Sequence, residues 1–378
     1  MKISCITTSV IPSNTANSIQ AMKVVHALYQ LGNEVNLIVP DYGKADWNEI
    51  ADIYGLQSEF EITWMPFYES LKKYDFCWNA VNSSRSRGAK VVYTWALQAA
   101  DFALLRNIPC AMEFHDFPMG PFGPILFRWY MRLETPKLTL TTTQALADGI
   151  EDLFKFRFAQ ESLQIAPNGT DPERYHNLPD PKEARRMLEL KEGITIGYTG
   201  HFYQGRGMDI LIELAKSLPE INFLWIGGRE KDIQPWRSRL SNQNIKNVLI
   251  SGFIPNSDLP LYQAACDILL MPYEKKISGS SGGEISRVIN PMKMFDYLAA
   301  GRAIVASEIP VFHEVLDEKT AVFCEPENPG DWTAKIRNLI NHPEGINRLA
   351  SNAKNKAALY TWKKRAAESI NRLKKILE

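Results

Sequence analysis

The chain has 378 residues, which is enough for two domains of ordinary size, and its 45% hydrophobic and 23% charged content is that of a soluble globular protein. Its 43 basic residues balance its 43 acidic residues, so no net charge favours binding to nucleic acid or to an anionic membrane. The five cysteines are scattered without a C-x-x-C pair, and no apolar run approaches the ~20 residues of a membrane-spanning helix, so we expect a cytoplasmic protein.

The first half of the chain alternates predicted strands with predicted helices. Residues 2–8 predict a strand, 19–30 an amphipathic helix and 34–39 a second strand, which together form a βαβ unit of a parallel sheet. The loop before this helix carries no G-x-G-x-x-G, so a dinucleotide fold of the nicotinamide type lacks its phosphate fingerprint. Further elements are predicted as strands at 90–93, 111–114, 138–142 and 163–166 and a helix at 143–154.

The second half repeats the same alternation after a turn at Asn168-Gly169 and a Pro-rich linker at 172–184. Strands are predicted at 194–198, 223–227, 248–254, 268–271, 303–306 and 321–324, and helices from 208, at 231–241, 259–265 and 310–316, and on to 360. The last helix, 362–377, has apolar residues at helical spacing. We expect its basic residues to line a solvated face: Lys363, Lys364, Arg365, Lys374 and Lys375.

Residues 278–301 form the most informative stretch, in which a flexible Ser/Gly run leads into a helix. Asn290 suits the N-cap, Pro291 the first helical position and Gly301 the C-terminal end. A helix N-terminus favours a phosphate group, and Asp296 lies roughly 9 Å further along the axis, about the distance from a diphosphate to the ribose of one nucleotide. A second interpretation is a capped core helix with Asp296 on its solvated face.

The run NPMKMFDYLAAG at 290–301, followed by RAIVAS, resembles the donor-binding helix of GT-B glycosyltransferases of family four. The resemblance implies that Asp296 binds the ribose of a nucleotide-sugar. In that family a second acidic residue, eight positions upstream, contacts the donor sugar. This chain has Val288 at that position, and Glu284 is the nearest replacement.

Two motifs of the first half follow the order of the same family. EFHD at 113–116 ends a predicted strand, and the resemblance implies that His115 reaches the donor sugar. NGTD at 168–171 resembles the turn that closes the first domain.

One motif of the second half resembles the family's diphosphate loop. YTGHFYQGRG at 198–207 is similar to a Gly-Arg…Lys-Gly loop whose two basic residues grip the donor diphosphate. His201 stands at the position of the Arg and Arg206 at the position of the Lys, and Lys293 is the residue able to replace the missing cation.

The resemblance spans nearly the whole chain and implies an α/β protein of GT-B fold, with two Rossmann-like domains whose parallel sheets face a central cleft. We expect an N-terminal acceptor domain at 1–172, a C-terminal nucleotide-sugar domain at 173–361, and a helix at 362–378 that crosses back to the N-domain. The predicted catalytic residues are His115, Arg206 and Lys293. The predicted donor-binding residues are Gly200, His201, Arg206, Gly252, Phe253, Ile254, Glu284, Asn290, Pro291, Met292, Lys293 and Asp296, and the acceptor or cleft residues are Ser18, Gln20 and Asp116.

The function implied by the resemblance is retaining transfer of a hexose from a UDP-sugar, such as UDP-glucose, to a glycan or lipid-linked acceptor in polysaccharide or glycoconjugate synthesis. The chain has no D-x-D triplet, so we expect no metal and no cofactor besides the donor substrate. Two other functions stay open: a GT-B sugar-nucleotide epimerase, and a non-catalytic sugar-nucleotide-binding subunit, which Val288 and His201 would suit.

The aromatic stretch 117–134, which contains Arg128 and Arg132, has two interpretations. One is a core helix preceded by a Pro/Gly loop. The other is a surface for a lipid acceptor, which would bring the protein to the inner face of a membrane.

Overall fold

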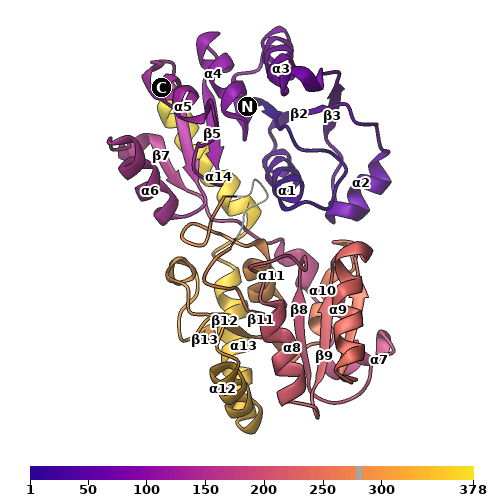
Figure 1. Ribbon diagram of the computed structural model, residues 1–378. Helices are drawn as coiled ribbons and strands as arrows, with labels where there is room; N and C mark the ends of the chain where they lie inside the picture. The colour runs from indigo at the N-terminus through magenta and orange to yellow at the C-terminus, as the bar shows by residue number, and fades with distance from the viewer. Residues whose placement is uncertain (278–282) are drawn as a thin grey trace. The chain divides into compact units, whose positions relative to one another are not determined.

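The computed structural model describes residues 1–277 and 283–378, which divide into two compact units (Figure 1). The first unit contains residues 1–168 and 362–378, and the second contains residues 169–361. Each unit is built on one parallel sheet with helices, so the predicted pair of Rossmann-like folds is confirmed. The predicted Ser/Gly run lies mostly outside the described residues.

The sheet of the first unit has the strand order β3-β2-β1-β4-β5-β6-β7. The order changes direction between β1 and β4, and the carboxyl ends of strands at such a switch point are where doubly wound sheets bind ligands. The strands are β1 (Lys2–Ile6), β2 (Glu34–Pro40), β3 (Glu61–Met65), β4 (Val91–Thr94), β5 (Cys110–Phe114), β6 (Lys137–Thr141) and β7 (Leu163–Ile165). The helices are α1 (Ala16–Gln30), α2 (Trp47–Tyr54), α3 (Tyr74–Ser86), α4 (Leu97–Leu105), α5 (Gly123–Arg132), α6 (Gln144–Phe154) and α14 (Trp362–Leu377).

Four of these elements have no counterpart in the sequence prediction: α2, β3, α3 and α4. β3 is the edge strand of the sheet, and its side chains are exposed or only partly buried. Its first four residues alternate polar with apolar side chains (Glu61–Trp64), so the strand carried a period-two signal that the sequence analysis did not use. α2 did carry a usual helix signal, because Asp46 caps it by accepting a hydrogen bond from the Glu49 N–H.

The terminal helix α14 packs against α1 in the first unit. Its apolar residues Ala366, Ile370 and Leu373 are buried, in agreement with their helical spacing. The expectation that Arg365 lies on the solvated face is wrong. Arg365 is 7% exposed because its guanidinium group reaches the buried carboxylate of Glu113 on β5.

The sheet of the second unit has the order β10-β9-β8-β11-β12-β13, with the switch point between β8 and β11. The strands are β8 (Thr195–Thr199), β9 (Asn222–Ile226), β10 (Val248–Gly252), β11 (Ile268–Met271), β12 (Ala303–Ser307) and β13 (Ala321–Cys324). The helices are α7 (Pro181–Met187), α8 (Met208–Ser217), α9 (Glu230–Asn242), α10 (Leu259–Ala264), α11 (Met292–Ala300), α12 (Pro329–Asn341) and α13 (Pro343–Ala357).

Two local predictions in this unit need correction. Pro291, and not Asn290, is the N-cap of α11, because Pro291 has extended backbone angles (φ −75°, ψ 128°) and its carbonyl accepts the Met294 N–H. The predicted helix at 310–316 is a 3₁₀ helix, Pro310–Glu314. Gly301 ends α11 in the left-handed conformation, as predicted.

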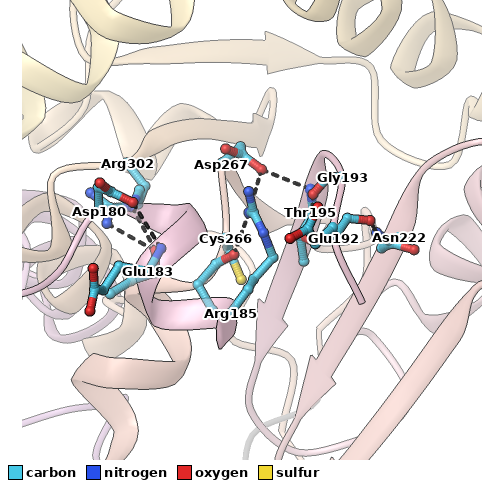
Figure 2. Close-up of polar contacts among 12 residues, drawn as sticks. Asp180, Glu183, Arg185, Glu192, Gly193, Thr195, Asn222, Cys266, Asp267 and Arg302 are labelled. Atoms are coloured by element: carbon cyan, nitrogen blue, oxygen red, sulfur yellow. Dashed lines mark hydrogen bonds and ion pairs between the residues drawn. The ribbon is translucent and has the colours of Figure 1, made fainter. Parts of the chain in front are cut away.

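The segment predicted as a linker, 172–184, is ordered and belongs to the second unit. It contains a 3₁₀ helix (Pro172–Tyr175) and the start of α7. Figure 2 shows how α7 is fastened at the amino ends of β8 and β11: Asp267 accepts from Arg185 at 2.9 Å and from the Thr195 N–H at 2.8 Å. Arg185 also donates to the Ala265 carbonyl at 2.9 Å, so a half-buried carboxylate ties three segments together.

The close approach of the loops after β8 and β11 gives a stability test. A Cβ atom at Gly207, where φ is +76°, would lie 1.6 Å from the Pro272 carbonyl oxygen. At Gly32, where φ is +78°, a Cβ atom would meet nothing within 4 Å. We expect Gly32→Ala to cost about 1–2 kcal/mol for the left-handed backbone, and Gly207→Ala about 1–3 kcal/mol more for the clash. Urea unfolding measures the free energy of unfolding of both variants. Equal losses of stability would mean that the loops after β8 and β11 move apart at no cost to accept the Gly207→Ala side chain.

Candidate functional site

The switch point of the second sheet holds the candidate site. β8 leads into a loop of residues 200–207, and β11 leads into Pro272 and Tyr273. The Glu274 N–H donates to the Gly205 carbonyl at 3.2 Å, and the Glu274 carboxylate accepts the Gly207 N–H at 3.3 Å. The two loops therefore form one connected wall.

Two cations lie against this wall. The Lys293 ammonium group, from the first turn of α11, is 3.9 Å from the ring centroid of Tyr198 and 5.4 Å from that of Tyr273. The Arg206 guanidinium group is 5.1 Å from the same Tyr273 ring. The structure thus brings together two of the predicted catalytic residues, Arg206 and Lys293, over one buried tyrosine.

Gly200 makes room for one of these cations. Its φ is +141°, and a Cβ atom there would lie 2.7 Å from the Lys293 nitrogen. α11 is held in place by the buried Tyr297, whose hydroxyl accepts the Thr199 N–H at 2.8 Å at the end of β8. The position of Lys293 is therefore set by both the loop and the helix.

The charges of this pair are not balanced locally. Within residues 1–277 and 283–378, neither Arg206 nor Lys293 makes an ion pair, and Nη1 of Arg206 is buried without a hydrogen bond. Desolvation and the neighbouring Arg206 charge hold the pKa of Lys293 well below its ordinary value. An anion placed between the two side chains would give Nη1 of Arg206 a hydrogen-bond acceptor and would offset the repulsion between the two cations. The arrangement is therefore that of an anion site.

Asp296 follows Lys293 by three residues on α11. The Thr170 hydroxyl donates to its carboxylate at 3.3 Å, and burial and the Asp296 charge raise the pKa of Tyr175 well above its ordinary value. Asp296 is only partly buried. The structure therefore joins the predicted ribose residue to the NGTD motif, whose Thr170 the sequence analysis did not connect with it.

The remaining predicted donor residues are spread along the same unit. Gly252 ends β10 with φ +77°, Phe253 is 48% exposed and Ile254 is half-buried. His201 stacks on Tyr203 with ring centroids 4.8 Å apart. The His201 carbonyl accepts from the Tyr198 hydroxyl at 2.8 Å, so His201 is joined to the tyrosine over whose ring Lys293 lies.

The position of the expected second acid is apolar and closed. Val288 is 1% exposed, so this site in the chain belongs to the core. Glu284, the proposed replacement, is exposed and accepts a hydrogen bond from the Ser286 hydroxyl at 2.8 Å. Its role at the sugar stays a prediction.

A second polar cluster lies in the first unit, at the carboxyl end of β5. The His115 Nε2 atom is 2.7 Å from the buried carboxylate of Glu113, which also accepts from Gln20 of α1 at 2.5 Å. Gln20 is 2% exposed, and Ser18 is fully buried with its hydroxyl donating to the Ser13 and Thr15 carbonyls. Ser18 and Gln20, two of the three residues predicted for the acceptor or cleft, thus make hydrogen bonds inside the first unit.

Asp116, the third residue predicted for the acceptor or cleft, follows His115 after β5. The Asp116 carboxylate accepts the adjacent Phe117 N–H at 2.7 Å. Sequence reasoning missed Tyr198 and Tyr273, although both lie at the ends of predicted strands, where ligand contacts are expected. No group of three His, Cys, Asp or Glu side chains suited to a metal occurs in the part of the chain that the structure describes.

Two doubly wound units, with the terminal helix belonging to the first, define the GT-B fold of glycosyltransferases. Solved structures share it over nearly the whole chain. Anabaena Alr3699/HepE in complex with UDP is 17% identical with a TM-score of 0.74, covering 98% of this chain and 100% of that one. Sucrose-phosphate synthase from Thermosynechococcus elongatus is 15% identical with a TM-score of 0.75, covering 100% and 99%.

The sequence comparisons agree with this fold. Residues 193–342 match the family model described as glycosyl transferases group 1, which supports the predicted family at that level. The putative teichuronic acid biosynthesis glycosyltransferase TuaH of Bacillus subtilis strain 168 is 24% identical over 49% of this chain and 44% of its own. The 2-deoxystreptamine glucosyltransferase of Streptomyces kanamyceticus is 23% identical over 67% and 73%. The alignment thus spans less than half of TuaH.

The unbalanced cation pair generates the first prediction for the site. We expect Lys293→Met to weaken UDP binding by roughly ten- to hundredfold, the value of a charged hydrogen bond, while stabilising the ligand-free protein. Because the pKa of Lys293 is lowered on folding, the unfolded chain binds more protons between the two pKa values, and stability rises with pH through that range. The variant should lose this rise.

Calorimetry with and without UDP, at several pH values, measures all three effects. Lys216→Met is the matched control, because Lys216 is an exposed lysine of the same unit that pairs with Glu213. Unchanged UDP affinity in a folded Lys293→Met variant would contradict the anion site.

The second prediction concerns Asp296. If its carboxylate binds the ribose hydroxyls, Asp296→Ala should weaken UDP by roughly ten- to hundredfold and leave 2′,3′-dideoxy-UDP almost unaffected. Thr170→Val, which removes one internal donor to Asp296 and leaves the carboxylate in place, is the control. Equal losses for both nucleotides, measured by titration calorimetry, would show that Asp296 acts on the fold and not on the ribose.

Proposed function

We propose that this protein is a retaining hexosyltransferase of family four, which moves the sugar of a UDP-sugar such as UDP-glucose to a glycan or lipid-linked acceptor without a metal ion. The observation that carries the proposal is the pair of unbalanced cations, Arg206 and Lys293, at the switch point beside the N-terminus of α11. A nucleoside diphosphate matches this site in charge.

The comparisons support the choice of donor. HepE has been solved with UDP and with UDP-glucose, and relatives include a 2-deoxystreptamine glucosyltransferase and a processive diacylglycerol alpha-glucosyltransferase of Acholeplasma laidlawii. We infer that the second unit binds the donor nucleotide and that the product enters a polysaccharide or glycoconjugate.

The proposed reaction needs no carboxylate nucleophile. The bond from the anomeric carbon to the diphosphate oxygen breaks as the acceptor oxygen approaches the same face of the sugar. Because attack and departure use the same face, the anomeric configuration is retained. The acceptor proton passes to the departing diphosphate oxygen, so the charges balance. Arg206, Lys293 and the α11 N-terminus offset the charge that develops on the diphosphate, and His115 contacts the sugar.

One experiment separates the proposed function from its rivals. A panel of nucleotide-sugars is tested for thermal stabilisation, since a ligand at 100 times its Kd stabilises by about 2.7 kcal/mol. NMR then follows slow hydrolysis of the best ligand in EDTA and in Mn²⁺. We expect UDP-glucose or another UDP-hexose to bind, and the released sugar to keep its configuration equally in both buffers.

The other outcomes are equally informative. A new sugar isomer still attached to UDP would indicate an epimerase. Binding without turnover would indicate the non-catalytic subunit, for which the buried Val288 is the specific observation. Activity abolished by EDTA would overturn metal independence, and no stabilisation by any nucleotide-sugar would overturn the proposal.

We also propose that the first unit contacts an anionic membrane through α5 and the loop before it. α5 buries Phe127 and Tyr130, as a core helix does, and it exposes other large apolar side chains, which support the proposed lipid surface. Met119, Phe122, Ile125 and Trp129 are 59%, 53%, 53% and 52% exposed. We call these four residues the α5 surface.

Charge and shape favour a lipid bilayer as the partner of the α5 surface. Residues 117–133 contain Arg128 and Arg132 and no acidic residue, and neither arginine makes an ion pair among the described residues. A cavity of about 290 Å³, lined by Leu97, Phe117 and Leu126 among others, opens beside it. No helix in residues 1–277 or 283–378 is long and apolar enough to cross a membrane, so contact would be with the surface of the bilayer.

Vesicle binding tests this contact. Each arginine near an anionic bilayer contributes about 1 kcal/mol, so Arg128→Gln/Arg132→Gln should weaken binding to phosphatidylglycerol vesicles about thirtyfold. Ile125→Ser/Trp129→Ser should weaken it as well. Arg186→Gln/Arg237→Gln in the second unit is the matched control. Binding that is equal for all variants would refute the α5 surface, and dimer formation lost on mutation would assign it to a second copy of the chain.

A further inference from the structure

The carboxylate of Glu113 is the most densely bonded group in the first unit. Glu113 is 1% exposed, and four donors from different segments converge on it. Its Oε1 accepts from Gln20 of α1 at 2.5 Å and from the Arg365 guanidinium of α14, and it lies 2.7 Å from His115 Nε2. Its Oε2 accepts from the Tyr93 hydroxyl of β4 at 2.6 Å.

The protonation state of this carboxylate is settled by its neighbours. Burial alone would raise the pKa of Glu113, but Arg365, His115 and Tyr93 outweigh burial and hold that pKa at about 2. Glu113 is therefore ionised at any physiological pH. An ionised carboxylate only accepts hydrogen bonds, so the proton between Glu113 and His115 belongs to the histidine Nε2.

The charge of Glu113 is already balanced by Arg365. Every arm of that guanidinium group is engaged: Nη2 binds Glu113, Nη1 lies 3.4 Å from the Tyr93 hydroxyl, and Nε donates to the Ala166 and Pro167 carbonyls at 3.2 and 3.0 Å. The Glu113–Arg365 pair is neutral as a whole. It therefore offers the imidazole a fixed hydrogen-bond acceptor that carries no net charge as a pair.

The remaining ring nitrogen of His115 is free for a ligand. The side chain is 27% exposed, and no hydrogen bond among the described residues engages Nδ1. We propose that Glu113 and Arg365 are positioning residues that hold His115 as the neutral Nε2–H tautomer, so that Nδ1 accepts a hydrogen bond from a hydroxyl of the donor sugar. This inference rests on the proposed function only for the identity of the ligand.

The tautomer can be observed without any enzyme assay. Long-range ¹H–¹⁵N spectra of histidine-labelled protein, assigned by comparison with His115→Ala, should show Nε2 protonated and Nδ1 unprotonated at neutral pH in the wild type. Tyr93→Phe, which removes only the neutral donor on Oε2, should keep that pattern. Protonation at Nδ1 in the wild type would overturn the proposal.

The variants test which residues impose the tautomer. Glu113→Gln should populate the Nδ1–H form of His115. It should lower kcat by roughly ten- to hundredfold and leave the UDP affinity unchanged. This loss in kcat should not exceed the loss in His115→Ala. Glu113→Gln/Arg365→Met removes both buried charges at once, and should show the same change if the single variant does not fold. An unchanged tautomer in the folded variant would reduce Glu113 to a purely structural role.

Arg365 has its own signature. Arg365→Met leaves Glu113 unbalanced, so His115 should hold a second proton at neutral pH and activity should rise with pH over a range where the wild type is flat. Arg365→Lys keeps the charge and should restore the wild-type profile in large part. If the wild type, Arg365→Met and Arg365→Lys share one pH–activity profile, then Arg365 does not control the protonation of His115. If no nucleotide-sugar is turned over at all, the proposed function fails, while the spectra still decide the tautomer.

Discussion

The second unit is organised around two cationic side chains that lie over the ring of one tyrosine and make no ion pair with the residues that the structure describes. Arg206 and Lys293 both lie over Tyr273, and the surrounding structure exists to keep them there: the glycine at 200 leaves space for the ammonium group, and Tyr297 fixes the helix that carries it. Holding desolvated cations side by side costs stability in the free protein. Such a cost is characteristic of a site that is completed by its ligand, because the missing counter-charge is then supplied from outside.

In the first unit, by contrast, the buried charges of Glu113 and Arg365 are paired. There a buried carboxylate, Glu113, meets its arginine within the fold, and both carboxylate oxygens and all three guanidinium nitrogens have hydrogen-bond partners. A matched pair of this kind has little affinity for an ion, but it fixes the geometry of whatever it touches. The unmatched cluster in the second unit is thus suited to bind an anion, whereas the matched cluster in the first unit is suited to orient a neighbouring side chain.

Sequence predicted the two sheets, and the structure brings together some of the residues predicted for the site, for reasons that differ between residues. Buried strands such as β11 are continuous apolar runs, and Gly301 ends α11 by a local rule, so both were visible. β3 was missed although its residues Glu61–Trp64 alternate polar with apolar side chains, because the run is only five residues long. Arg365 was misplaced because helical spacing says nothing about a partner 252 positions away, and Val288 looked like a lost acid until its burial showed a core position. Local patterns thus found the elements, whereas long-range contacts decided the roles of their charged residues.

The return of α14 to the first unit has a consequence for the order in which the protein matures on the ribosome. Residues 169–361 are continuous and contain everything that the second sheet requires. The first unit, although its strands are synthesised earlier, must wait for the last seventeen residues before Glu113 receives its arginine. Domains usually fold in the order of synthesis. Here the unit made first is the one finished last, and its buried carboxylate keeps it incomplete until α14 has left the ribosome.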